Sequence, residues 1–166
     1  YTPARPTGEK LSPWLSLLVL EAPDKGEPGE FEIVERRDPL PALRVTQPSA
    51  LPPLTQSWAC GHVSINEGHA SPTEFETFLL SLREPGSVNA DRIIARLVSP
   101  RELEVDTAYR AFLVPAFETG RLAGLGPDPS AADAQAPAWN GSAAVELPYY
   151  FEWYFRTGEN EDFELL

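Results

Sequence analysis

The chain contains no methionine, only one cysteine (Cys60) and only two histidines among its 166 residues. A single cysteine cannot form an internal disulfide, which excludes a small disulfide-stabilised scaffold and is typical of proteins in a reducing compartment. We therefore expect a cytoplasmic location. Because methionine is missing even at position 1, we also expect residues 1–166 to be a single domain taken from a longer protein.

Basic residues are scarce as well. The 13 Lys and Arg residues stand against 25 Asp and Glu residues, which gives a net charge of −12. Nucleic acids and anionic membranes are bound by basic surfaces, so both are excluded as general partners. No apolar run approaches the roughly 20 residues of a membrane-spanning helix. The longest, residues 14–20, has the length of a strand, and we expect no membrane insertion.

Apolar residues make up 42% of the chain and aromatic residues 10%, which is enough to form a hydrophobic core. The 18 prolines and 11 glycines indicate a fold with many loops and turns. Residues 1–12 are polar and interrupted by proline, so we expect an extended arm there. Residues 127–138 are small, polar and proline-bearing, and we expect a flexible surface loop.

Alternating or continuous apolar patterns predict strands in six segments. These are residues 14–20, 31–35, 43–46, 57–65, 107–114 and 145–155. Residues 107–114 are apolar on both faces, which predicts a central strand, and the aromatic residues 147–155 are its expected neighbour. Within that neighbour, Phe151, Trp153 and Phe155 are predicted to face the core.

Residues 71–74 (SPTE) form a capping box with proline at the first helical position, and an apolar stripe follows at helical spacing. A helix is therefore predicted from residue 72 to the Pro-Gly at 85–86. Shorter helical segments are expected at residues 89–97, 99–102, 119–126 and after 161. Strands and helices alternate without a regular βαβ rhythm. This predicts an α+β fold with a mainly antiparallel or mixed β-sheet and two or three short helices.

Cys60, His62 and His69 are the candidate metal ligands, with Glu67 as a possible fourth donor. Thiolate and imidazole suit a transition metal, and a strand would point Cys60 and His62 to the same side, although the spacing matches no standard zinc pattern. A Cys60–His62 nucleophilic pair is a further hypothesis, but the neighbouring residues supply no positive charge to activate the thiol. The alternative is a buried cysteine beside a hydrogen-bonded histidine. We expect no catalytic residues and no cofactor.

The segment around residues 149–155 is dense in aromatic side chains. Tyr150, Tyr154 and Arg156 are predicted to face outward, and residues of these types are enriched at protein interfaces. The alternative is packing within the chain itself, at the rim of its core. A carbohydrate-binding module is a further hypothesis, because the chain has four tryptophans and five tyrosines and aromatic rings stack on sugars.

Four blocks of the sequence carry a resemblance to a known group of proteins. They are residues 13–20 (PWLSLLVL), 57–65 (SWACGHVSI), 99–126 and 146–166. These blocks resemble a family of large, uncharacterised bacterial proteins that accompany gene clusters for phage-tail-like contractile injection systems. The resemblance implies a non-enzymatic structural or accessory role, with other proteins or other domains of the parent chain as partners, and it implies no catalytic residues. A metal-dependent or Cys/His hydrolase domain is the alternative.

Overall fold

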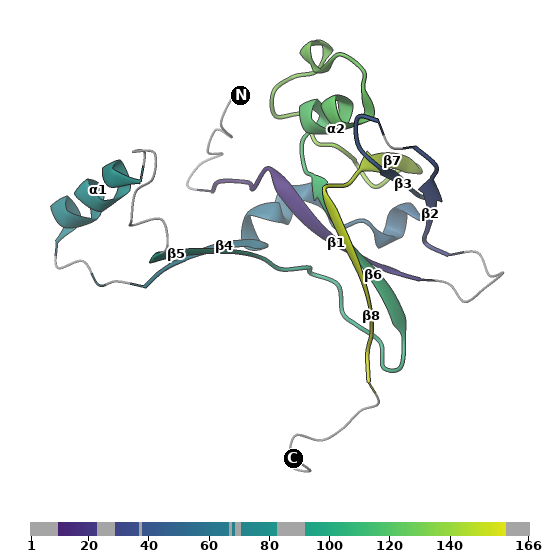
Figure 1. The fold of residues 1–166 in the computed structure, drawn as a ribbon, viewed down its shortest axis with the longest axis horizontal. Coiled ribbons are helices and arrows are strands. Elements are labelled where there is room, and N and C mark those ends of the chain that lie inside the picture. The colour runs from purple at the N-terminus through teal and green to yellow at the C-terminus, as the bar shows by residue number, and fades with distance from the viewer. Residues whose placement is uncertain are drawn as a thin grey trace. The chain divides into compact units, whose positions relative to one another are not determined.

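The computed structural model describes residues 10–22, 29–36, 38–66, 68, 71–82 and 92–158. The chain divides into two compact units, one formed by Tyr1–Cys60 with Val98–Leu166 and the other by Gly61–Leu97. Within the described residues, eight strands form three small antiparallel sheets, accompanied by helices (Figure 1). The α+β prediction is confirmed.

The first unit is organised around strand β6 (Ala108–Pro115). This strand lies between β1 (Leu15–Glu21) and β8 (Phe151–Arg156) and pairs with both in antiparallel register. The predicted central strand and its pairing with the aromatic segment are thus both found. Strand β1 is at an edge of this sheet among the described residues.

The second sheet has the order β2-β3-β7. Its strands are β2 (Phe31–Val34), β3 (Ala42–Val45) and β7 (Val145–Pro148). The single strand predicted over residues 145–155 is therefore wrong, because β7 and β8 belong to different sheets. Pro148 has no N–H with which to extend a ladder. The N–H of Tyr149 then donates to the Pro41 carbonyl, whereas that of Tyr150 donates to the Leu113 carbonyl.

The main core lies between these two sheets. Side chains of β1 and β6, such as Leu18 and Phe112, pack in one cluster with side chains of β3 and β7. The Phe112 ring makes edge-to-face contacts with Phe31 at 5.1 Å and with Tyr149 at 5.3 Å between centroids. Such contacts add to the stabilisation that burial of the rings provides.

The end of the segment expected as a surface loop, residues 127–138, also contributes to this core. After the 3₁₀ turn η4 (Pro129–Ala131), the chain returns to Ala138, which is buried and donates its N–H to the Ala116 carbonyl. The adjacent Trp139 is buried, and its indole N–H donates to the Pro52 carbonyl at 2.8 Å. A buried indole N–H needs such a partner, so this bond fixes the ring.

Helix α2 (Glu118–Leu125) covers β7, and Gly126 ends it in the left-handed conformation with φ 100°. The Arg121 guanidinium binds both carboxylate oxygens of Glu118 and donates to the Glu146 carbonyl. The contact between helix and strand is close at Gly124. A Cβ atom there would meet Pro148 side-chain atoms at 2.5 and 2.7 Å. Only glycine permits this approach without movement of the neighbour.

Two other predictions about local structure in the first unit are wrong. Residues 57–60 are not a strand, because η2 (Leu54–Ala59) is a 3₁₀ helix that follows Pro53 and ends at Cys60. The η1 turn (Pro48–Ala50) precedes it in the proline-rich loop. Residues 99–102 form no helix and no other regular secondary structure, and the Ser99 hydroxyl accepts only a weak bond from the Arg101 N–H at 3.4 Å.

The second unit contains β4 (Gly61–Ile65), β5 (Ile93–Leu97) and α1 (Pro72–Ser81). The predicted cap of α1 is confirmed, since the Ser71 hydroxyl accepts the N–H of Glu74. Its predicted stop at 85–86 lies outside the described residues. The helix predicted over 89–97 is wrong, because residues 93–97 form β5 and pair with β4. The β-branched Ile93 and Ile94 suit a strand better than a helix.

We predict that Gly124→Ala destabilises the first unit by about 1–3 kcal/mol, because the added methyl group overlaps Pro148. Gly158→Ala is the matched control, since nothing lies within 4 Å of the position that its added methyl group would take, and its effect should stay within about 0.5 kcal/mol. Urea unfolding measures both. A gain of about 1 kcal/mol for Gly124→Ala, as helix propensity alone predicts, would contradict this packing.

Candidate functional site

Strand β8 exposes several large aromatic side chains at the surface of the first unit. Phe151 is 62% exposed and Trp153 is 41% exposed, so the prediction that both face the core is wrong. The two rings lie 6.0 Å apart. Their register opposite Leu113 and Ala111 places them on the face of the sheet that does not enter the main core. Phe155 lies on the same face of β8 and is more buried than Phe151 and Trp153. Its ring stacks on the Tyr109 ring, with 5.6 Å between centroids.

The residues predicted as an interface are also at the surface. Tyr150 is 44% exposed, Tyr154 is 59% exposed and Arg156 is exposed. The Tyr150 ring contacts Trp14 edge-on, with 6.4 Å between centroids. Phe151 and Trp153 are thus the exposed aromatic side chains on one face of β8, and we call them the β8 aromatic surface; Tyr154 lies on the opposite face, with Glu152 and Arg156. Exposed apolar patches of this kind mark sites of association in soluble proteins.

The backbone of β8 is paired on one side only within the described residues. Thr157 donates its N–H to Thr107, opposite it in register, so alternation directs the backbone groups of Phe155, Trp153 and Phe151 toward β6. The N–H and C=O groups of Glu152, Tyr154 and Arg156 point the other way. They form an open sheet edge among the residues that the structure describes.

Two ion pairs hold the charged side chains of β8. Glu152 lies 3.4 Å from Arg110, and Arg156 lies 2.9 Å from Asp106. The hydrogen bond from Arg156, together with its positive charge, lowers the pKa of Asp106 below its ordinary value, and the same contact raises the pKa of Arg156. Asp106 occupies a turn with φ 48°, a conformation that aspartate tolerates better than most residues.

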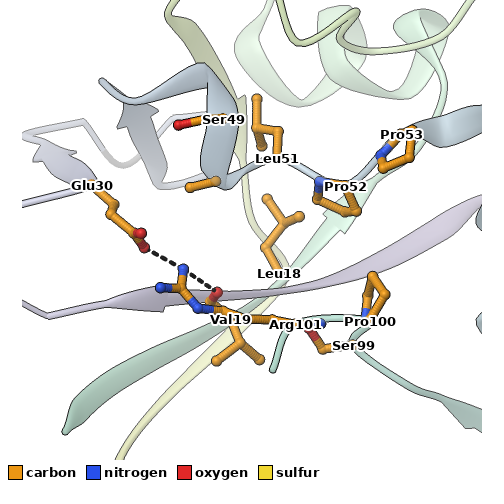
Figure 2. A pocket seen from close by; sticks show the side chains of 11 residues that line it. Leu18, Val19, Glu30, Ser49, Leu51, Pro52, Pro53, Ser99, Pro100 and Arg101 are labelled. Atoms are coloured by element: carbon orange, nitrogen blue, oxygen red, sulfur yellow. Dashed lines mark hydrogen bonds and ion pairs between the residues drawn. The ribbon is translucent and has the colours of Figure 1, made fainter. Parts of the chain in front are cut away.

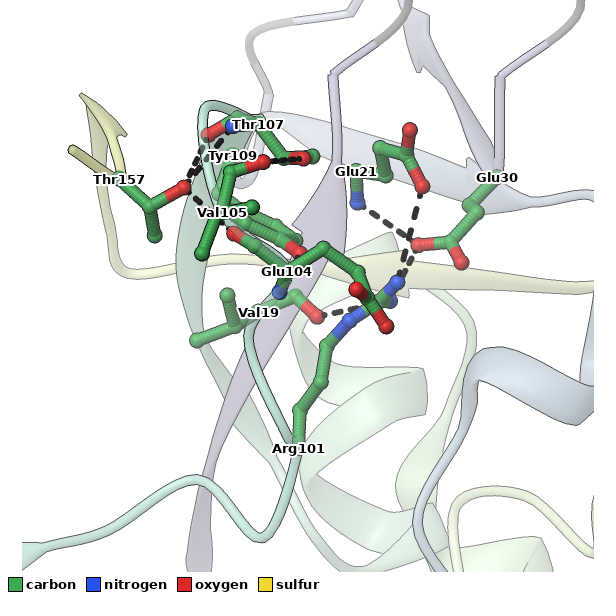
Figure 3. Close-up of polar contacts among 9 residues, drawn as sticks. All are labelled: Val19, Glu21, Glu30, Arg101, Glu104, Val105, Thr107, Tyr109 and Thr157. Atoms are coloured by element: carbon green, nitrogen blue, oxygen red, sulfur yellow. Dashed lines mark hydrogen bonds and ion pairs between the residues drawn. The ribbon is translucent and has the colours of Figure 1, made fainter. Parts of the chain in front are cut away.

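The opposite edge of the same sheet, at β1, is covered by charged side chains (Figure 3). The Arg101 guanidinium donates to the Val19 carbonyl at 3.3 Å and pairs with the Glu30 carboxylate. That carboxylate accepts the N–H of Glu21 at 2.7 Å. Together, Arg101 and Glu30 satisfy one acceptor and one donor that β1 directs away from β6. An edge occupied in this way cannot accept another strand at these positions.

Arg101 makes several of the contacts that stabilise the chain around β1. Its guanidinium lies 5.3 Å from the centroid of the Tyr109 ring, in cation–π contact. Partial burial opposes its positive charge, but the Glu30 hydrogen bond and the surrounding negative charge outweigh that effect and raise the pKa of Arg101. The Tyr109 side chain is also joined to the preceding turn (Figure 3), since its hydroxyl accepts the N–H of Glu104 at 2.8 Å.

A cavity of about 350 Å³ lies beside this ion pair. Figure 2 shows it lined on one side by Leu51 and Pro52 and on the other by Leu18 and Arg101. The Arg101 guanidinium is directed at Glu30 and the Val19 carbonyl, both within the chain. The charged groups of this cavity are thus engaged in holding the fold together.

A second cavity, of about 850 Å³, lies along the proline-rich 3₁₀ segment. Trp58, Phe117 and Asn140 are among its lining residues. The Lys10 ammonium group lies 3.8 Å from the centroid of the Trp58 ring, so it covers one face of that indole. A sugar could stack on Trp58 only at the other face.

Two of the four candidate metal ligands, Cys60 and His62, lie among the described residues. Cys60 ends η2 in the first unit, and it is a free thiol of intermediate burial. His62 lies on β4 in the second unit, opposite Arg96. Glu67 and His69 lie outside the described residues. Among the residues that are described, no group of three or more His, Cys, Asp or Glu side chains could hold a metal ion.

The sequence reasoning missed the roles of Arg101 and Glu30 and the exposure of Phe151 and Trp153. Arg101 and Glu30 are 71 residues apart, so no local pattern relates them. Exposure at Phe151 and Trp153 follows from the edge position of β8, which the alternating pattern alone does not specify.

Within the described residues, no helix has the length and apolar character needed to cross a membrane. Comparison with known proteins adds no relative, since no family model, no curated protein and no solved structure matches this chain.

We predict that Arg101→Leu lowers the free energy of unfolding by about 1–3 kcal/mol, because it removes the cation paired with the Glu30 carboxylate and the donor to the Val19 carbonyl. Arg44→Leu, at an exposed position of β3, is the control, with an expected change within about 0.5 kcal/mol. Both are measured by urea unfolding. Equal effects would show that the ion pair at β1 contributes nothing beyond surface charge.

We predict that the Asp106 carboxyl titrates below its ordinary pKa of 3.8 and returns toward that value in Arg156→Gln. Because the folded-state pKa is lowered, the Asp106–Arg156 contact contributes its full stability above the ordinary pKa and loses it as pH falls through the lowered one. Carbon-detected NMR of the Asp106 side chain, from pH 6 to pH 2, measures this. A titration curve unaffected by Arg156→Gln would contradict the pairing.

Proposed function

We propose that this chain is a non-enzymatic protein-interaction domain that binds its partners through the β8 aromatic surface. The supporting observation is the exposure of Phe151 and Trp153 on a strand whose neighbours are well ordered by hydrogen bonds. Burial of an aromatic side chain removes about 150–250 Å² from water, at roughly 25 cal/mol per Å². A partner that covers both rings therefore gains several kcal/mol before the costs of association.

The surroundings of these rings suit recognition of a protein. On the other face of β8, Tyr154 provides a hydroxyl group, and Glu152 and Arg156 supply charges of both signs. Aromatic residues and arginine are the types enriched at interface centres. The net charge of −12 favours a partner with a basic surface, since complementary charge accelerates association.

The sequence resemblance suggests the kind of assembly in which this interaction takes place. Residues 99–126 and 146–166, which contain β6 and β8, are among the blocks that resemble proteins accompanying phage-tail-like contractile injection systems. We infer that the domain is an accessory component of such an assembly. Its partners are then structural proteins of the particle or other domains of the parent chain.

We predict that the double variant Phe151→Ser/Trp153→Ser binds the purified structural proteins of a phage-tail-like contractile particle at least about tenfold more weakly than the unmodified chain, because it removes the apolar area. Biolayer interferometry with the chain immobilised measures the dissociation constants. Val63→Ser, at a 67% exposed apolar position of β4, is the matched control and should bind unchanged.

Thermal unfolding of the double variant establishes that the fold is kept. Two results would contradict the proposed function: undiminished binding by the folded double variant, or no binding of any particle protein by the unmodified chain. Either would show that the β8 aromatic surface does not recognise these proteins.

A further inference from the structure

We propose that two copies of this chain pair through their β8 strands, edge to edge and antiparallel, with Tyr154 opposite Tyr154 of the second copy. This inference rests on the proposed function, in that it takes β8 as a contact surface and names a second copy as one occupant of its edge. It joins two three-stranded sheets, each ordered β1-β6-β8, into one sheet of about six strands.

The two edges of the sheet differ in a way that selects β8. At β1, Arg101 and Glu30 occupy outward backbone groups and block addition of a strand. At β8, the outward N–H and C=O groups belong to Glu152, Tyr154 and Arg156, and among the described residues no backbone partner faces them. The strand contains no proline and no lysine, the residues that usually discourage edge pairing.

The charges of β8 determine which partner fits this edge. In an antiparallel pair centred on Tyr154, Glu152 lies opposite Arg156 of the second copy, and the symmetry repeats that contact with the roles exchanged. Opposite charges directly across a strand pair are favourable, and like charges there are unfavourable. A pair centred on Glu152 or on Arg156 would instead place identical charges opposite one another. The Tyr154 register alone makes two complementary pairs.

The same register also continues the apolar face. Trp153 lies opposite Phe155 of the second copy, in a non-hydrogen-bonded position where side chains approach closely. The exposed Phe151 and Trp153 of both copies then form one aromatic ribbon across the joined sheet. Backbone groups, charges and apolar side chains are therefore satisfied by one arrangement of two identical strands.

The contact is short. Strand β8 has six residues, which gives a length of about 20 Å and an interface below the size of a permanent dimer. We expect reversible association with a dissociation constant on the order of 1–100 μM, since small interfaces give weak complexes. Sedimentation velocity of the full chain between about 1 and 500 μM should show a shift from monomer to dimer across that range.

A charge exchange tests the register. Arg156→Glu alone, or Glu152→Arg alone, places like charges opposite each other twice, and each should raise the dissociation constant at least about tenfold. The double variant Glu152→Arg/Arg156→Glu restores opposite charges between copies and should regain most of the lost affinity. Within one copy it disrupts the contacts with Arg110 and Asp106 at once, so recovery cannot come from intrachain pairing.

A backbone variant tests the hydrogen bonds separately. Tyr154→Pro removes the outward N–H at the centre of the pair, and proline is tolerated at such a position of an edge strand. It should be monomeric at 500 μM, whereas Tyr154→Ala should still dimerise. Circular dichroism and thermal unfolding confirm that each variant is folded.

The self-pairing is overturned if the unmodified chain is monomeric throughout, or if the folded double charge variant dimerises no better than either single variant. These results are independent of binding to particle proteins. A monomeric chain that binds those proteins through Phe151 and Trp153 overturns the self-pairing only, and a dimer that binds none of them overturns the proposed function only.

Discussion

The division of hydrogen bonds along β6 is the constraint on which the first unit depends. Even-numbered residues of this strand, such as Ala108, bond toward β1, and odd-numbered residues, such as Leu113, bond toward β8. Its side chains alternate in the same way, so that Phe112 and Val114 enter the main core while Tyr109 and Ala111 form a smaller cluster on the other face. One strand thus fixes the register of both neighbours. It also determines which side chains of β8 face away from the main core.

The elements that the sequence predicted correctly are those with strong local signals. Strand β6 is apolar on both faces, and α1 begins with a complete capping box whose hydroxyl acceptor is found in the structure. The elements it predicted wrongly had weaker local patterns. Residues 93–97 have a helix-compatible pattern, but pairing with β4 makes them a strand, so tertiary context overrides the local preference there. Residues 57–60 alternate like a strand, but the preceding prolines lead into a 3₁₀ helix, so neighbouring residues decide that case.

The sequence predicted the exposure of some residues of the candidate site and not of others. The exposure of Tyr150 and Tyr154 follows from alternation in an aromatic segment, and the structure places both at the surface. The exposure of Phe151 and Trp153 depends on β8 being an edge strand, a property of sheet order rather than of the segment itself. The Arg101–Glu30 pair joins residues that are 71 positions apart, so no spacing in the sequence could reveal it.

The break between β7 and β8 connects the fold to the surface that we assign to function. Because Pro148 ends one ladder, Tyr149 turns into the core against Phe112 while Tyr150 begins a new ladder on β6. The position of that break determines which face of the sheet each later side chain of β8 occupies. A shift by one residue would exchange the two faces. With the break displaced by one, Phe151 and Trp153 would lie on the side of the main core, and Glu152 and Arg156 would replace them on the opposite face. The location of a single proline therefore decides that β8 presents aromatic rings on one side and complementary charges on the other.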